Sequence, residues 1–257
     1  MNSEDHFKKV EKLYDNRIES THDSVKATGG WESEQYVSSI CEEIYKKIGI
    51  SKNDRVLELG CGSGVLGNWI KKRCDYYVGI DISFKMLDFF LKTDSDQKTN
   101  LLQGNTDSIP LSNHTFDVII LNGVTMYFPD DITLEKTLQE MKRISKPNGI
   151  IFIGENISLS SYPWELTWFQ DLTGFTQTLA KPYIKIRKWI AMKIPKLAGK
   201  WKSVHKEISP IFIRKYFDGS GEVIQSKAAS YTIKKKIQGK KYKGNRRIDF
   251  LIRLNRG

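Results

Sequence analysis

The chain has 257 residues, of which 39% are hydrophobic and 11% aromatic, and this suits one large domain with a well-packed core. It contains no run of about 18 uncharged apolar residues, so we predict no transmembrane segment. The first residues lack the apolar stretch of a signal peptide and three irregularly spaced cysteines exclude a disulfide framework, so we expect a cytoplasmic protein. The four histidines form no cluster with ligand spacing, and we predict no metal.

Charge is unevenly distributed along the chain. Residues 1–155 hold 19 Lys and Arg against 24 Asp and Glu, whereas residues 156–257 hold 22 against 6, so the net charge of +11 belongs to the second half. Such an asymmetry favours an anionic partner for that half, such as a phosphorylated molecule, nucleic acid or membrane surface. A solvated basic face is the alternative interpretation.

Apolar periodicity predicts one helix and then an alternation of strands and helices. Ser33 is placed to cap a helix that ends before Gly49, with Val37, Ile40, Cys41, Ile44 and Ile48 on one face. The predicted strands are Arg55–Leu59, Tyr76–Ile80, Leu101–Gln103, Phe116–Leu121 and Gly149–Gly154. The predicted helices between them are Gly64–Arg73, Ser83–Leu91 and Ile132–Ile144. This alternation predicts an α/β fold with a doubly wound, mostly parallel sheet and helices on both faces.

The alternation stops after residue 155. Residues 156–206 are rich in aromatic side chains, and residues 173–206 carry nine Lys and Arg without an acid. We interpret 156–206 as an inserted segment that covers the substrate. Its basic, aromatic character suits contact with an anionic membrane surface or closure over an anionic acceptor. The alternative is a lid that packs on the sheet with its lysines in water. Two further strands, Tyr231–Lys236 and Ile248–Leu254, are expected to complete a seven-stranded sheet.

These observations divide the chain into four parts. We predict an N-terminal cap segment over 1–32, an α/β core over 33–155, the inserted segment over 156–206, and C-terminal strands over 207–257. The cap and the insertion are expected to hold the substrate, because both lie outside the regular alternation.

A glycine-rich loop follows the first predicted strand. Gly60, Gly62 and Gly64 stand at alternate positions after Glu58, where glycine lets the backbone approach a ligand closely. Asp81 ends the next strand, where a carboxylate can accept hydrogen bonds from both hydroxyls of a ribose. Loop and acid together predict a nucleoside site, although a tight turn and a helix cap would explain each of them separately.

Two cofactor classes fit this loop. Residues 62–67 spell the dinucleotide fingerprint, with Asp81 at a suitable distance, so an NAD-dependent oxidoreductase fits the motif alone. The ordered set of motifs, however, resembles the class I S-adenosylmethionine-dependent methyltransferases. Glu58-x-Gly60-x-Gly62-x-Gly64 and Asp81–Leu87 are similar to the first and second motifs of that family, and Gly104–Leu111 to the loop that reads the adenine edge. Phe116–Ile120 with Asn122, and Lys142–Gly149, match the family's fourth strand and the turn before its fifth.

The resemblance implies S-adenosylmethionine as cofactor and residues 33–155 as the core that binds it. The cofactor-binding residues it implies are Glu58, Gly60, Cys61, Gly62, Gly64, Asp81, Ile82, Met86, Asn105, Thr106 and Asn122. Asn105 stands where the family usually has aspartate, which predicts a weaker contact to adenine, and Met86 could equally fill the core.

The implied reaction is methyl transfer to an N or O atom of a small-molecule acceptor that is anionic or linked to a carbohydrate or lipid. An RNA methyltransferase that uses the basic half is the alternative, although the sequence has no recognised RNA-binding module. A cofactor-binding protein without catalysis is a third class. Tyr127 and Glu155 follow the fourth and fifth strands and are expected pocket residues, but the sequence identifies neither as a general base.

Overall fold

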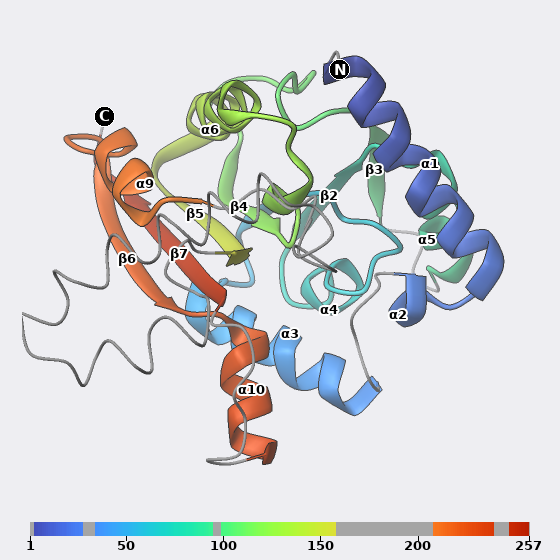
Figure 1. Ribbon diagram of the computed structural model, residues 1–257. Helices are drawn as coiled ribbons and strands as arrows, with labels where there is room; N and C mark the ends of the chain where they lie inside the picture. The colour runs from blue at the N-terminus through green and yellow to red at the C-terminus, as the bar shows by residue number, and fades with distance from the viewer. Residues whose placement is uncertain (1–2, 28–33, 95–98, 158–207, 239–246, 257) are drawn as a thin grey trace, which may run out of the picture.

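In the computed structural model, which describes residues 3–27, 34–94, 99–157, 208–238 and 247–256, seven strands form one sheet in the order β3-β2-β1-β4-β5-β7-β6 (Figure 1). They are β1 Arg55–Leu59, β2 Tyr76–Asp81, β3 Asn100–Gln103, β4 Phe116–Asn122, β5 Ser145–Ile157, β6 Gly221–Lys227 and β7 Arg247–Leu254. Neighbours among β1 to β5 pair in parallel, whereas β7 runs antiparallel to β5 and β6. The predicted mostly parallel, seven-stranded sheet is confirmed.

Helices cover both faces of the sheet. Successive residues of a strand point to opposite sides, so the central strands present apolar side chains to both faces, and the helices bury them. Ile119 and Leu121 of β4 belong to the hydrophobic cluster that includes residues of α6 and α9, while Val118 and Ile120 belong to the cluster on the other face. That second cluster includes residues of α3, α4, α5 and α10. The helix bounds are α1 Ser3–Thr21, α2 Ser24–Ala27, α3 Glu34–Ile48, α4 Gly67–Ile70, α5 Phe84–Thr93, α6 Asp131–Ile144, α9 Pro210–Tyr216 and α10 Ala229–Gln238.

The strands and helices predicted for the α/β core are present, but two of them differ clearly in length, since β5 extends over Ser145–Ile157. α3 runs to Ile48 with all five predicted apolar residues buried, and its predicted cap, Ser33, lies outside the described residues. The helix predicted over Gly64–Arg73 is much shorter, because only Gly67–Ile70 is helical. The inserted segment falls outside the described residues except at its first two positions, which end β5. Within the described ranges, no helix combines the length and apolarity needed to cross a membrane.

The strand predicted over Tyr231–Lys236 is wrong, because these residues belong to α10. Ala229 and Ile233 both pack in the hydrophobic cluster that contains α3. They are four residues apart, which places them on one face of a helix. The strand that completes the sheet is instead β6, which lies at its edge and was not predicted. Most residues of β6 are partly or fully exposed, so its sequence has little of the apolar pattern that marks a buried strand.

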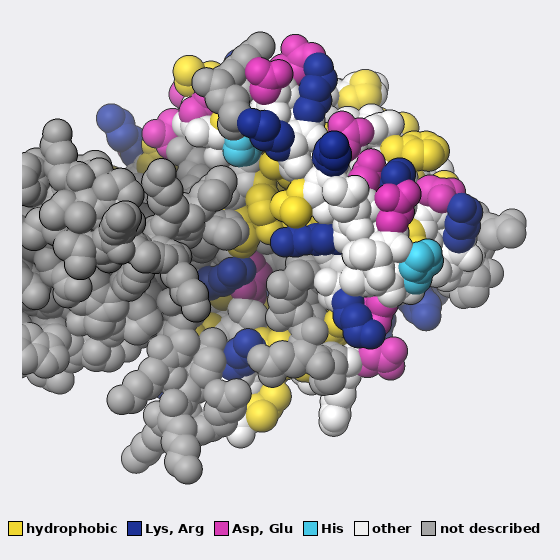
Figure 2. Space-filling view, turned by 45° about the vertical axis from the view of Figure 1, so that its right-hand side comes forward, with side chains coloured by type: hydrophobic (Ala, Val, Ile, Leu, Met, Phe, Trp, Pro, Cys, Tyr) yellow, Lys and Arg dark blue, Asp and Glu magenta, His cyan; other side chains and the backbone are white. Residues whose placement is uncertain are grey.

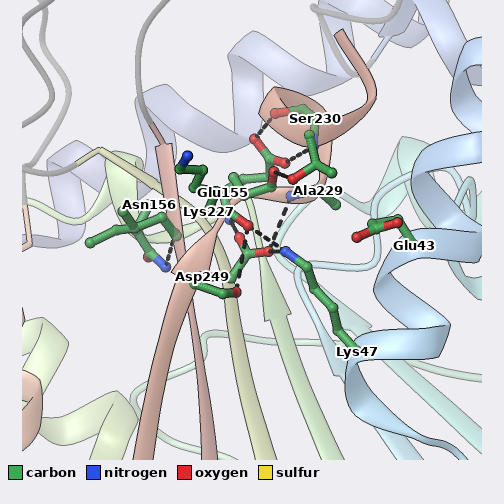
Figure 3. A network of polar contacts seen from close by, with 12 residues as sticks. Glu43, Lys47, Glu155, Asn156, Lys227, Ala229, Ser230 and Asp249 are labelled. Atoms are coloured by element: carbon green, nitrogen blue, oxygen red, sulfur yellow. Dashed lines mark hydrogen bonds and ion pairs between the residues drawn. The ribbon is translucent and has the colours of Figure 1, made fainter. Parts of the chain in front are cut away.

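A buried carboxylate in β7 joins three other elements (Figure 3). Asp249 Oδ2 accepts from Lys47 Nζ of α3 at 2.7 Å and from the Ala229 backbone N–H at 3.1 Å, and Oδ1 accepts from the Glu155 N–H at 2.9 Å. Burial, and next the nearby Glu155 carboxylate, raise the pKa of Asp249 to about 7, while Lys47 acts against this rise. The side chain therefore fixes the end of β5 and the start of α10 relative to α3.

We expect Asp249→Ala to lower the free energy of unfolding by about 3–5 kcal/mol, because it leaves Lys47 and two backbone N–H groups without their acceptor. Urea unfolding measures the change. Glu222→Ala is the matched control, since its carboxylate is 66% exposed and pairs with Arg253 at 3.5 Å, and it should cost less than about 1 kcal/mol. Equal losses in the two variants would contradict this account.

Candidate active site

A cavity of about 640 Å³ opens at the carboxyl ends of β1, β2, β4 and β5, where open α/β sheets bind their ligands. Figure 2 shows hydrophobic side chains gathered in a hollow, with basic and acidic side chains around them. All the cofactor-binding residues expected from the sequence line this cavity except Gly64. Tyr127 and Glu155, expected as pocket residues, line it as well.

The glycines of the loop have different surroundings. Gly62 has φ +53°, and a Cβ there would meet nothing within 4 Å, so this side of the loop faces open space. Gly64 has φ +82°, and a Cβ there would lie 2.3 Å from the Phe90 ring of α5. Gly62 thus leaves room for a ligand, whereas Gly64 allows α5 to pack closely against the loop.

Asp81 connects this loop to α5. Its Oδ2 accepts from the Gly62 N–H at 2.8 Å and its Oδ1 from the Ser83 N–H at 2.9 Å, while Ser83 Oγ caps the helix by accepting from the Met86 N–H at 3.1 Å. Burial raises the pKa of Asp81, and the backbone N–H groups oppose that rise. Asp81 is therefore not the helix cap itself, but it holds the residue that is.

Glu58 of β1 is buried, with 4% of its surface exposed, and lines the cavity. Tyr77 donates a hydrogen bond to its Oε2 at 2.6 Å, and burial raises the pKa of Glu58 to about 8. Burial thus raises the pKa of both acids beside the loop, while the Tyr77 hydroxyl opposes the rise in Glu58 and backbone N–H groups oppose it in Asp81.

The opposite end of the cavity is formed by the end of β5, the start of α10 and the start of β7. Glu155 is buried in an irregular part of the β5–β7 pairing and has φ +58°, a conformation that non-glycine residues rarely adopt. Its carboxylate accepts from the Ser230 N–H at 2.9 Å and the Ser230 Oγ at 2.5 Å (Figure 3). It also lies 3.7 Å from Arg247 Nη1. Lys234 of α10 lines the same end, with its ammonium 5.5 Å from the Tyr36 ring centroid.

One face of α1 forms another wall of the cavity. Phe7, Val10, Tyr14 and Arg17 recur at helical spacing and all line it. The Tyr14 ring meets the Tyr127 ring edge-on, with centroids 5.5 Å apart. The apolar members of this face have helical spacing in the sequence, but nothing in the local pattern marked Arg17, Ser230, Lys234 or Arg247 as cavity residues.

Comparison with known proteins agrees with this geometry. Residues 57–153 match the family model described as a methyltransferase domain. An uncharacterized methyltransferase of Schizosaccharomyces pombe is 22% identical over 216 residues, which are 73% of this chain and 77% of that protein. The 18S rRNA (guanine-N(7))-methyltransferase of Mus musculus is 43% identical over 63 residues, 24% of this chain and 22% of that protein.

A solved structure has the same fold. Phosphoethanolamine N-methyltransferase 1 of Haemonchus contortus, in complex with phosphoethanolamine and S-adenosylhomocysteine, matches with a TM-score of 0.69 at 10% identity, covering 100% of this chain and 50% of that one. This chain is a class I S-adenosylmethionine-dependent methyltransferase. The methyltransferase therefore uses S-adenosylmethionine, and the NAD-dependent alternative no longer applies.

The cavity wall fits this cofactor. In the described part of the methyltransferase, the buried side-chain N and O atoms without a hydrogen-bond partner are Arg17 Nη1, Asn122 Oδ1 and Ser145 Oγ. Arg17 and Asn122 both line the cavity, and such atoms are rare in native proteins unless a ligand or water satisfies them. When bound, S-adenosylmethionine supplies a methyl group already activated on a sulfonium. The protein's part is to align an acceptor with it and, for a hydroxyl acceptor, to remove a proton.

Gly62 and Gly64 give a direct test of how the cofactor lies against the loop. Gly62→Ala should cost about 1–2 kcal/mol of stability for its positive φ and should also weaken S-adenosylhomocysteine binding, because its methyl group enters the open space of the cavity. Gly64→Ala should lower the free energy of unfolding by about 1–3 kcal/mol more than Gly62→Ala, because its methyl group clashes with Phe90. The folded variant should nevertheless bind S-adenosylhomocysteine nearly as well as the wild type.

Urea unfolding and calorimetric titration with S-adenosylhomocysteine measure the two effects separately. Wild-type affinity in Gly62→Ala would mean that the cofactor does not approach this side of the loop.

Proposed function

We propose that the methyltransferase transfers a methyl group to an N or O atom of a small anionic acceptor, which binds at the end of the cavity formed by β5, α10 and β7. The observation that carries the proposal is the pair of cationic side chains, Lys234 and Arg247, in the wall of that end. Glu155 is the carboxylate beside them, and it is already engaged by Ser230.

The surroundings of the two cations favour an anionic group over a neutral one. Arg247 approaches Glu155 at 3.7 Å, and a guanidinium has five N–H donors, so it can hold this ion pair and a carboxylate or phosphate of the acceptor together. Lys234 lies with its ammonium 5.5 Å from the Tyr36 ring centroid and lines the same end of the cavity. Two cations in one cavity wall attract an anion more strongly than either does in bulk water.

The size of the cavity favours a small acceptor over RNA. A volume of about 640 Å³ is within the usual range for small-molecule sites and must hold the cofactor as well. An RNA base could enter only if it were flipped out of its strand. The rRNA-modifying relative overlaps this chain over only 63 residues, so its substrate gives little support for RNA here.

A screen with radiolabelled S-adenosylmethionine tests the proposal. The panel contains phosphorylated amines such as phosphoethanolamine, small carboxylates, carbohydrate- and lipid-linked phosphates, uncharged analogues of each, and total RNA. We expect label in an anionic small molecule and little in its uncharged analogue. Label confined to RNA, or equal label in charged and uncharged analogues, would overturn the proposal.

With an acceptor in hand, Lys234→Gln should raise its KM about 10- to 100-fold, the usual effect of losing a hydrogen bond to a charged group. The Kd of S-adenosylhomocysteine should stay unchanged. Lys235→Gln removes the same charge from the exposed next residue of α10 and should leave both constants unaltered. A similar rise of KM in both variants would indicate general electrostatic attraction rather than a contact by Lys234.

A further inference from the structure

We propose that Arg17 of α1 binds the carboxylate of the methionine moiety of S-adenosylmethionine, so that the N-terminal helix belongs to the cofactor site. The sequence had led us to expect this segment to hold the acceptor. The proposal concerns cofactor binding and does not depend on the identity of the acceptor.

The cavity face of α1 is built for a ligand more than for the protein core. Ile18 is the buried residue of α1, whereas Phe7, Val10, Tyr14 and Arg17 turn toward the cavity. Polar contacts hold the helix in place: Ser83 Oγ donates to Asp15 Oδ1 at 2.6 Å, and Lys85 Nζ lies 2.5 Å from Glu19 Oε1. The helix is therefore tied to the start of α5, while its cavity face remains available.

Arg17 is the cationic member of this face. Its guanidinium carbon lies 5.0 Å from the Tyr14 ring centroid, and its Nη1 is buried with no hydrogen-bond partner. Among the described residues no carboxylate forms an ion pair with it. A buried guanidinium nitrogen without an acceptor is costly, so this geometry is expected where a ligand supplies the missing anion.

Two contacts place Arg17 beside the cofactor loop. Asp15, two residues earlier, is bonded to Ser83, which follows Asp81 by two residues. Further along the chain, the Ser24 carbonyl accepts a hydrogen bond from Ser63 Oγ of the glycine-rich loop at 3.1 Å. The stretch that carries Arg17 is thus fixed at one end to the predicted ribose-binding strand end and at the other to the loop.

The chemistry of the cofactor then selects one group. S-adenosylmethionine contains a sulfonium, an ammonium, two ribose hydroxyls, adenine and one carboxylate, and the carboxylate is its only anion. A guanidinium is complementary to a carboxylate and repels the two cations. Asn122 Oδ1, the other cavity-lining side-chain atom without a partner, is an acceptor and matches the ammonium. One donor and one acceptor without partners in the same cavity suit an amino-acid zwitterion.

Two ligands isolate this contact. S-adenosylhomocysteine and 5′-methylthioadenosine share adenine, ribose and the thioether, but only the first has the carboxylate and ammonium. Calorimetric titration of the full chain should show that Arg17→Gln weakens S-adenosylhomocysteine about 10- to 100-fold and leaves methylthioadenosine unchanged. Arg17→Lys should fall between, because it keeps the charge but not the paired donors. Lys12→Gln, on an exposed position of α1, is the control and should change neither affinity.

Three outcomes would overturn the proposal. Equal weakening of both ligands in Arg17→Gln would mean that the residue supports the helix without contacting the carboxylate. Unchanged affinity for both would mean that Arg17 does not contact the cofactor, and a raised acceptor KM would then assign it to the acceptor. If Lys12→Gln lowered the affinity for S-adenosylhomocysteine as much as Arg17→Gln does, the effect would come from the net charge of α1 and not from a contact by Arg17. Because neither titration needs an acceptor, these results are independent of the Lys234 experiment.

Discussion

Asp81 and Asp249 each accept backbone N–H hydrogen bonds from two segments, and the cavity lies between the structures they hold. Asp81 joins the glycine loop to the residue that caps α5, and Asp249 joins the end of β5 to the first residue of α10. A carboxylate near a helix N-terminus also interacts favourably with the helix dipole. Both ends of the site are therefore fixed in the same way. At each end, a carboxylate on a strand accepts a backbone hydrogen bond at the start of a helix.

The charged side chains at the two ends of the cavity come from different parts of the chain. Arg17 and Asp81, on the side of the glycine loop, belong to the acidic first half, whereas Lys234 and Arg247 belong to the basic second half. Glu155, the last residue of the first half, lies at the same end as these two cations. The second half reaches the cavity because β7 inserts next to β5 and brings the C-terminal residues to the carboxyl edge of the parallel strands.

The sequence was sufficient to predict the central strands and most of the cavity wall on the cofactor side. β1 and β4 are largely buried on both faces, so their residues are mostly apolar, and the glycine loop directly follows β1 while its acid, Asp81, ends β2. α10 was missed because its N-terminal N–H groups are satisfied by Asp249 and Glu155, which are distant in the sequence. Arg17 could not be identified either, because its proposed role depends on α1 lying against the start of α5, where Asp15 and Glu19 contact Ser83 and Lys85. Gly64 was predicted to bind the cofactor together with Gly60 and Gly62. Spacing alone does not show that Gly62 faces open space whereas Gly64 packs on Phe90.

The arrangement of charge has a consequence for the order of events in the proposed reaction. Before transfer, an anionic acceptor would be attracted by Lys234, by Arg247 and by the sulfonium of the cofactor. After transfer the sulfonium has become a neutral thioether, so one of these three attractions is gone and the methylated product is held less tightly than the acceptor was. The carboxylate of the cofactor is unchanged by the reaction, so a contact with Arg17 would hold substrate and product cofactor alike. On this view, α1 governs cofactor affinity, and the β5, α10 and β7 end of the cavity governs which acceptor binds and how readily it leaves.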